Sequence, residues 1–277
     1  MKFTQPFILL LALALLAVPI AAQANAVNNS KSCSLATLNG SYGVLEQGTF
    51  LAQLPGFPPP PFPAVNSVIA TYDGAGNVSG NFTASFGGVI VPGTFSGIYT
   101  VNRDCTYSME FTALPLGVVL HETGTITGRG MFQEIHLMYT DPFLVASGTA
   151  KKTPPGGCSL ETFKGTYALF GEGMVTAQIP GFPPPPVLFA HNGIFTADGA
   201  GNFSGEDTAS FDGVIVPGTF TATYAINPDC TGSAVITDSL GLAIHEVGTI
   251  TGMGGFRELH SIITDAGWVV AETSKKQ

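Results

Sequence analysis

The chain has 277 residues, of which 45% are hydrophobic and only 10% are charged, and its formal net charge is −9. A surface of this charge repels nucleic acid and anionic membranes, and no basic cluster offsets it, so nucleic-acid binding is excluded. After an export signal is removed, the length suits two domains of about 120 residues each.

The first segment of the chain is typical of a secretory signal peptide. Lys2 precedes an apolar run over residues 7–18, and Ala22-Gln23-Ala24 supplies small residues for cleavage. We predict that residues 1–24 are removed and that the protein is secreted or periplasmic; an uncleaved anchor is the alternative. No later stretch reaches the roughly 20 apolar residues of a spanning helix, so we expect no transmembrane segment after signal cleavage.

The remainder of the chain is one sequence repeated in tandem. Cys33-Ser-Leu returns as Cys158-Ser-Leu, 125 residues later, and the intervening motifs return at the same spacing. Such a repeat predicts a duplicated structural unit. We expect a first repeat at residues 33–152, a Pro/Gly linker at 153–157 and a second repeat at 158–277.

Each repeat contains two cysteines at matching places. In an exported protein this arrangement predicts disulfide bonds, and we expect Cys33–Cys105 and Cys158–Cys230. The alternatives are the two pairings that cross between repeats, and free buried thiols. The chain has no Cys-x-x-Cys spacing, so the cysteines do not predict a metal site.

Within a repeat, short runs rich in Val, Ile, Thr, Tyr and Phe alternate with Gly, Pro, Asn and Asp. This pattern predicts an all-β fold of short antiparallel strands joined mostly by tight turns. Closing eight strands on themselves removes exposed edges, so we expect an up-and-down β-barrel in each repeat, with a β-sandwich as the alternative. The strands expected in the first repeat are residues 41–50, 65–72, 77–86, 94–101, 106–113, 118–127, 131–140 and 143–150.

The longest connection in each repeat is rich in proline. Its core is Pro-Gly-Phe-Pro-Pro-Pro-Pro, at residues 55–61 and again at 180–186. Consecutive prolines favour an extended polyproline helix and cannot join a sheet ladder. Phe57 and Phe182 in these loops either bind a ligand or partner, or pack onto the end of the barrel.

The best cluster of ionisable groups lies in the hairpin over residues 118–140. With Arg129 at the centre of the turn, Glu122 lies opposite His136, and Glu134 lies one step diagonally on the same face. A register slip of one residue would bring in His121 instead and remove its glutamate neighbour. The apolar residues expected on the same, inward face are Leu120, Ile126, Phe132 and Met138.

The second repeat carries the same cluster as Glu246, Glu258 and His260, with His245 taking the place of His121 after a slip. Three interpretations compete: a buried structural network, a ligand-binding or acid–base catalytic site, and a zinc or iron site. We take the six residues as candidate catalytic or binding groups, and we expect neither a metal nor a cofactor. The apolar residues expected beside the second cluster are Ile244, Ile250, Phe256 and Ile262.

Three motifs in each repeat carry a family resemblance: Cys-Ser-x5-Gly-x-Tyr, Asp-Gly-Ala-Gly-Asn and Asn-x-Asp-Cys. They resemble a group of exported bacterial proteins built on a β-barrel domain. More distantly, the strand pattern is similar to allene oxide cyclase-like and lipocalin-like barrels. The resemblance implies a cavity for a small apolar molecule, but no cyclase motif accompanies it.

These observations predict an exported tandem β-barrel protein that binds a small apolar ligand inside the barrel without catalysis. One alternative is a cyclase or isomerase that uses the Glu/His cluster. The other is a structural or interaction module that uses its proline-rich loops toward an unidentified protein partner.

Overall fold

The computed structural model describes residues 32–277. The predicted signal peptide, residues 1–24, therefore lies outside the described residues. No helix within the described part of the chain is long and apolar enough to cross a membrane.

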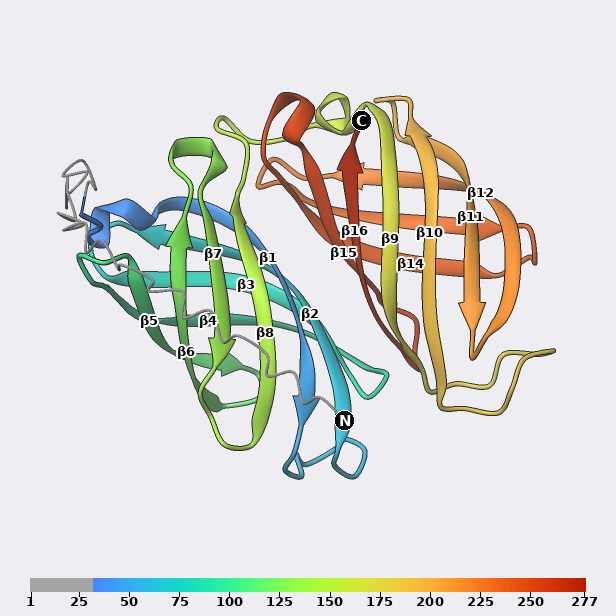
Figure 1. The fold of residues 1–277 in the computed structure, drawn as a ribbon, viewed down its shortest axis with the longest axis horizontal. Helices are drawn as coiled ribbons and strands as arrows, with labels where there is room; N and C mark the ends of the chain where they lie inside the picture. The colour runs from blue at the N-terminus through green and yellow to red at the C-terminus, as the bar shows by residue number, and fades with distance from the viewer. Residues whose placement is uncertain (1–31) are drawn as a thin grey trace, which may run out of the picture. The chain divides into compact units, whose positions relative to one another are not determined.

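Each repeat folds as a closed antiparallel barrel in which every strand pairs with the next and the first pairs with the last (Figure 1). The prediction of up-and-down barrels is confirmed, and the sandwich alternative is wrong. The strands of the first barrel are β1 (Asn39–Phe50), β2 (Phe62–Asp73), β3 (Asn77–Phe86), β4 (Val89–Val101), β5 (Thr106–Leu114), β6 (Val118–Thr127), β7 (Glu134–Tyr139) and β8 (Leu144–Lys152).

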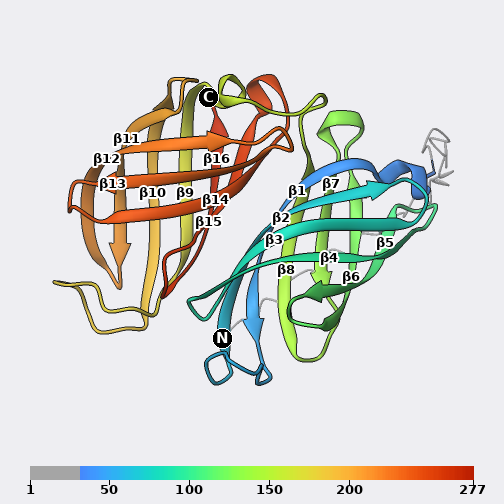
Figure 2. The same cartoon turned by 180° about the vertical axis from the view of Figure 1, so that it is seen from behind.

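The second barrel repeats this order, with closure between its first and last strands. Figure 2 shows the opposite sides of the barrels, which include β3 and β4 in the first and β12 and β13 in the second. The strands of the second barrel are β9 (Gly165–Val175), β10 (Val187–Ala197), β11 (Asn202–Phe211), β12 (Val214–Ile226), β13 (Thr231–Asp238), β14 (Ala243–Thr251), β15 (Glu258–Ile263) and β16 (Trp268–Lys276).

Both ends of each barrel are closed by short segments that carry a buried or partly buried apolar side chain. Before β1, the 3-10 helix Leu35–Leu38 buries Leu38 completely, and Phe163 takes this place in the second barrel. The proline-rich loop follows β1 and therefore lies at its other end. The disulfides Cys33–Cys105 and Cys158–Cys230 form as predicted and tie the segment before each first strand to a turn of the same barrel.

The interiors of the two barrels are packed differently. The first is filled by a single hydrophobic cluster, whereas the second contains two, one around Phe163 and one around Trp268. Along β10, Phe189 belongs to one of these clusters and Phe195 to the other. Because side chains alternate along a strand, His191 points inward between them. A polar group thus separates the two halves of the second core.

Candidate functional site

The β6–β7 hairpin has a different register from the one expected. Glu122 lies opposite Tyr139, and His136 lies opposite Thr125. The expected pairing of Glu122 with His136 is therefore wrong. The chain reverses through residues 128–133, which include the 3-10 turn Gly130–Phe132, and not through a tight turn centred on Arg129. The observed register differs from the expected one by an odd number of residues. The side chains of β7 that were expected inside the barrel therefore lie outside it, and those expected outside lie inside.

This exchange separates the residues of the predicted cluster. Glu122 points into the barrel and is 3% exposed, whereas the His136 side chain is 55% exposed and, like Glu134, lies on the outer face. Because Glu122 lies inside the barrel while Glu134 and His136 lie outside, these three residues cannot bind one metal ion together. No group of three side chains that could hold a metal ion occurs within residues 32–277. Of the apolar residues expected inside, Leu120 and Ile126 are buried, but Phe132, Met138 and Phe256 are exposed; the inward side chains of β7 are Ile135, Leu137 and Tyr139.

On the outer face, Glu134 and Glu258 form ion pairs. Glu134 contacts Lys151 at 3.1 Å and His136 at 3.6 Å. Glu258 contacts Lys151 at 2.7 Å and His260 at 3.1 Å. Burial by itself would raise the pKa of Glu258, but hydrogen bonds from His260 and Lys151 and their charge lower it to about 2. These outer glutamates neutralise neighbouring cations and do not face either cavity.

The histidines of the alternative register also lie outside the barrels. The Nδ1 atom of His121 is 2.9 Å from Asp141, and that of His245 is 2.8 Å from Asp265. Each aspartate also accepts a hydrogen bond from the backbone N–H of its histidine. The pairs clamp the turn between the seventh and eighth strands of each barrel.

Inside the first barrel, Glu122 meets a second carboxyl that the sequence interpretation missed. Glu46, on β1, is also buried, and it accepts hydrogen bonds at Oε2 from Tyr139 at 2.8 Å and from Asn66 at 2.9 Å. Tyr107 donates a bond to Glu122 at 3.2 Å. Burial raises the pKa of both glutamates, and the proximity of Glu46 raises that of Glu122 further. The two carboxyls therefore hold a proton at pH values where an exposed glutamate is ionised.

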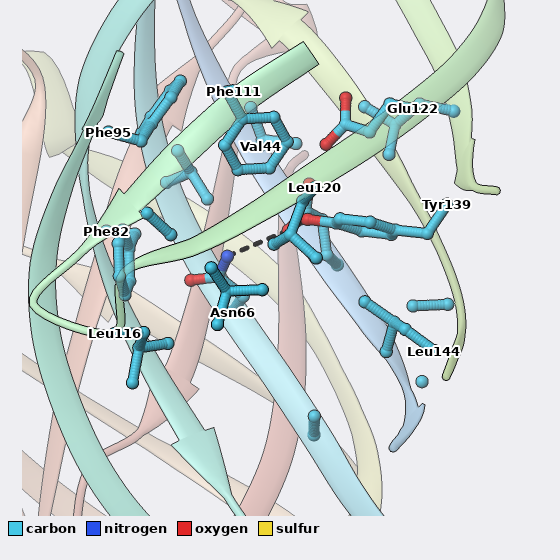
Figure 3. Close-up of a pocket in the computed structure, with 18 of the residues that line it drawn as sticks. Val44, Asn66, Phe82, Phe95, Phe111, Leu116, Leu120, Glu122, Tyr139 and Leu144 are labelled. Carbon is cyan, nitrogen blue, oxygen red and sulfur yellow. Dashed lines mark hydrogen bonds between the residues drawn. The ribbon is translucent and has the colours of Figure 1, made fainter. Parts of the chain in front are cut away.

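The carboxyl pair lies in the wall of a largely apolar cavity (Figure 3). The cavity leaves about 70 Å³ for the centres of water-sized molecules. This corresponds to roughly five waters, or about the volume of a single six-membered ring. Among the residues that line it are Val44, Phe82, Phe95, Phe111, Leu120 and Leu144.

Asn66 adds an unpartnered polar atom to this wall. Its amide nitrogen donates to Glu46, the bond drawn as a dashed line in Figure 3. Its oxygen, Oδ1, is buried and has no hydrogen-bond partner among the described residues. In the view of Figure 3 this oxygen points away from the bond, toward the side of Phe82. A buried acceptor without a donor costs free energy unless a bound group supplies one.

The second barrel also has a carboxyl pair, but one of its two carboxyls comes from a different strand. Glu246 takes the place of Glu122, whereas Gly171 takes the place of Glu46. The second carboxyl comes instead from Glu272 on β16, which lies directly opposite Gly171. In the first barrel the residue opposite Glu46 is Gly148. The glutamate and the glycine have thus exchanged strands while the carboxyl remains at the same cross-strand position.

The second cavity also differs in the groups around this carboxyl. It leaves about 80 Å³ for the centres of water-sized molecules. His191 replaces Asn66, and its Nε2 lies 2.9 Å from Glu272 while its Nδ1 lies 3.4 Å from Asp207. Burial alone would lower the pKa of His191, but the charges of Glu272 and Asp207 raise it to about 9. His191 is therefore protonated at neutral pH.

The strand pattern contained a signal for the missed glutamate. In β1, Tyr42, Val44 and Glu46 alternate on one face, so an inward apolar face carries one carboxyl. The role of Glu272 had no comparable signal, because it depends on the pairing of β16 with β9.

The aromatic residues of the proline-rich loops pack onto the barrels. Phe57 lies against Phe62 and Phe86, with ring centroids 6.3 and 5.5 Å apart. The ring centroids of Phe182 and Phe211 are 4.4 Å apart. Gln53 donates hydrogen bonds from its side chain to carbonyl oxygens of the first loop, including that of Phe57 at 3.0 Å. The loop therefore holds an aromatic ring against the end of the first barrel.

Comparison with known proteins leaves the family open: no protein-family model matches the chain, and no curated protein matches its sequence. The resemblance to an exported bacterial domain thus stays a prediction.

Proposed function

We propose that the first barrel binds a small, largely apolar molecule, about one ring in size, that carries a hydroxyl group. The observation that carries this proposal is the unpartnered Oδ1 of Asn66 beside the Glu46–Glu122 pair in an apolar cavity. A ligand hydroxyl would donate to Asn66, and the apolar body would fill the rest of the space. Because burial favours the protonated form of the pair, the site favours a neutral ligand.

Other features support binding by an exported protein. The signal-like N-terminal segment predicts export, and the disulfides are typical of proteins outside the cytoplasm. The similarity to lipocalin-like barrels points to the same class of function by analogy of fold alone. We propose binding without catalysis, since the Glu/His cluster of the isomerase alternative is divided between the two faces of the barrel wall. The proline-loop alternative remains an untested prediction.

Phenol and toluene have nearly the same shape and differ in the hydroxyl, so they test this proposal directly. We expect phenol to bind the first barrel about fivefold more tightly than toluene, since one buried hydrogen bond contributes on the order of 1 kcal/mol. The change Asn66→Leu should abolish this preference while leaving toluene binding within about twofold. Titrations followed by backbone amide chemical shifts measure both affinities and locate the site.

The matched control is His191→Leu, which alters the equivalent position of the second barrel and should leave phenol binding to the first unchanged. Equal affinities for phenol and toluene, or an Asn66→Leu variant that keeps its preference for phenol, would overturn the proposal. Amide shifts confined to the outer surface would do the same.

A further inference from the structure

The two barrels contact each other through faces that are not equivalent in the repeat. In each barrel we call the outer face of the first three strands the leading face and that of the last three strands the trailing face. The leading face of the first barrel, on β1–β3, contacts the trailing face of the second, on β14–β16. Val65 lies in this contact in one apolar cluster with Ile262 and Val269. Ser85 donates a hydrogen bond to the backbone oxygen of Trp268 at 2.6 Å.

The duplication supplies a second leading face, on β9–β11, that no part of the described chain covers in this way. Phe170 stands at the repeat position of Leu45, and Ile194 at that of Ile69. Leu45 packs against the apolar cluster between the barrels, and Ile69 is buried. Their counterparts are open: Phe170 is 52% exposed, and Ile194 and Leu188 on the same face are also exposed.

The trailing face of the first barrel, on β6–β8, is open as well. Met138 and Val145 stand at the repeat positions of Ile262 and Val269. Ile262 and Val269 are fully buried, whereas Met138 is 53% and Val145 64% exposed. Contiguous exposed apolar side chains mark interaction sites on soluble proteins. One molecule thus carries one open leading face and one open trailing face, copies of the two surfaces that bury each other within it.

The charges beside the contact are repeated too. Lys151, next to the leading face of the first barrel, lies 2.7 Å from Glu258 on the trailing face of the second. The repeat counterparts of these two residues are Lys275 and Glu134, and both are partly exposed. Opposite charges therefore lie at the places that would meet if the two open faces came together, which favours that orientation.

We propose that the open leading face of the second barrel binds the open trailing face of the first barrel in another copy of this chain. A contact between two different faces repeats head to tail, so it builds a ring or a filament. The approach differs from the one within the chain, because Ala168 takes the place of Gly43. A Cβ atom at Gly43 would lie 2.8 Å from Cβ of Thr249. The copies therefore lie further apart at this point, where Phe170 offers a larger side chain than Leu45.

Sedimentation velocity over a micromolar-to-millimolar series of the mature chain, residues 25–277, tests this proposal. We expect the mean mass to rise with concentration beyond that of one chain. Phe170→Asp on the open leading face, or Met138→Asp on the open trailing face, should each weaken self-association about tenfold, because a charge enters an apolar contact. The matched control is Ile98→Asp on β4, outside both faces, where the side chain is equally exposed.

Mixing the Phe170→Asp and Met138→Asp proteins tests the head-to-tail arrangement itself. Each variant keeps one intact face, and the two intact faces are complementary. We therefore expect one-to-one complexes with nearly the affinity of the unaltered contact, and no growth beyond two chains. Far-UV circular dichroism checks that each variant is folded.

An unaltered chain that stays monomeric over the whole series would overturn the proposal. So would a folded Phe170→Asp or Met138→Asp protein that associates as tightly as the Ile98→Asp control, or two variants that do not combine when mixed. This inference does not depend on ligand binding by the first barrel, so the two proposals can fail separately.

Discussion

In each barrel, one glycine leaves the space that a buried glutamate on the neighbouring strand occupies. A Cβ atom at Gly148 would lie 2.7 Å from Cγ of Glu46, and one at Gly171 would lie 2.8 Å from Cγ of Glu272. Real Cβ atoms essentially never approach so closely, so each glycine leaves room for the glutamate opposite. In the first barrel the glutamate lies on the first strand and the glycine on the last, and in the second barrel the two residues have exchanged strands. Each of these cross-strand positions therefore holds one carboxyl.

We predict that Gly148→Glu destabilises the first barrel by about 2–4 kcal/mol, through crowding and an additional buried carboxyl. Adding Glu46→Gly reproduces the arrangement of the second barrel and should recover most of this loss. Urea unfolding followed by near-UV circular dichroism measures it, because five of the seven tyrosines lie in the first barrel. A double variant no more stable than the single one would contradict the inference that the glutamate and the glycine can exchange strands.

At the scale of elements, loops decide access to the cavity and the faces that line it. The proline-rich loop after β1 places Phe57 against Phe62 and Phe86, and Phe86 lines the cavity. The β6–β7 turn places Tyr139 inward, where it donates its hydrogen bond to Glu46. The strands provide the wall, and these two connections complete the site.

We expect Phe57→Ala to destabilise the first barrel by about 1–3 kcal/mol, since it removes a partly buried ring, and to open the end of the cavity. Phenol should then dissociate faster, which NMR line shapes at increasing phenol concentration detect. Leu51→Ala is the matched control, because Leu51 follows β1 and is half exposed. A dissociation rate that is equal in the Phe57→Ala variant and the unaltered chain would show that the loop does not cover the site.

At the scale of the whole molecule, two barrels of one topology contain cavities of different electrostatic character. In the first, burial raises the pKa of both carboxyls. In the second, His191 has its pKa raised to about 9 and Glu272 has its pKa lowered, so these two groups form a buried ion pair. The duplication therefore preserved the fold and the cavity while the polar groups changed.

This difference predicts a pH dependence for the first barrel. Because the pKa of Glu122 is raised in the folded state, its contribution to stability is complete below its ordinary pKa of about 4.5 and is lost as the pH rises through the folded-state value. We expect Glu122→Gln to remove most of the decline in the free energy of unfolding that sets in as the pH rises above about 4.5, measured by urea unfolding at the tyrosine signal. Glu134→Gln, on the outer face, should keep the decline; an unchanged slope in Glu122→Gln would refute the assignment.

The sequence by itself determined the repeat, because matching motifs and their spacing are directly countable, and it predicted the disulfide pairs and the barrel from cysteine positions, strand alternation and turn residues. The structure decided between these predictions and their alternatives. The sequence also singled out Glu122 and Glu246 as buried candidates. Only the tertiary structure decided their partners. The turn over residues 128–133 moved His136 to the outer face. Barrel closure, which pairs strands distant in the sequence, set Glu46 opposite Gly148 and Gly171 opposite Glu272.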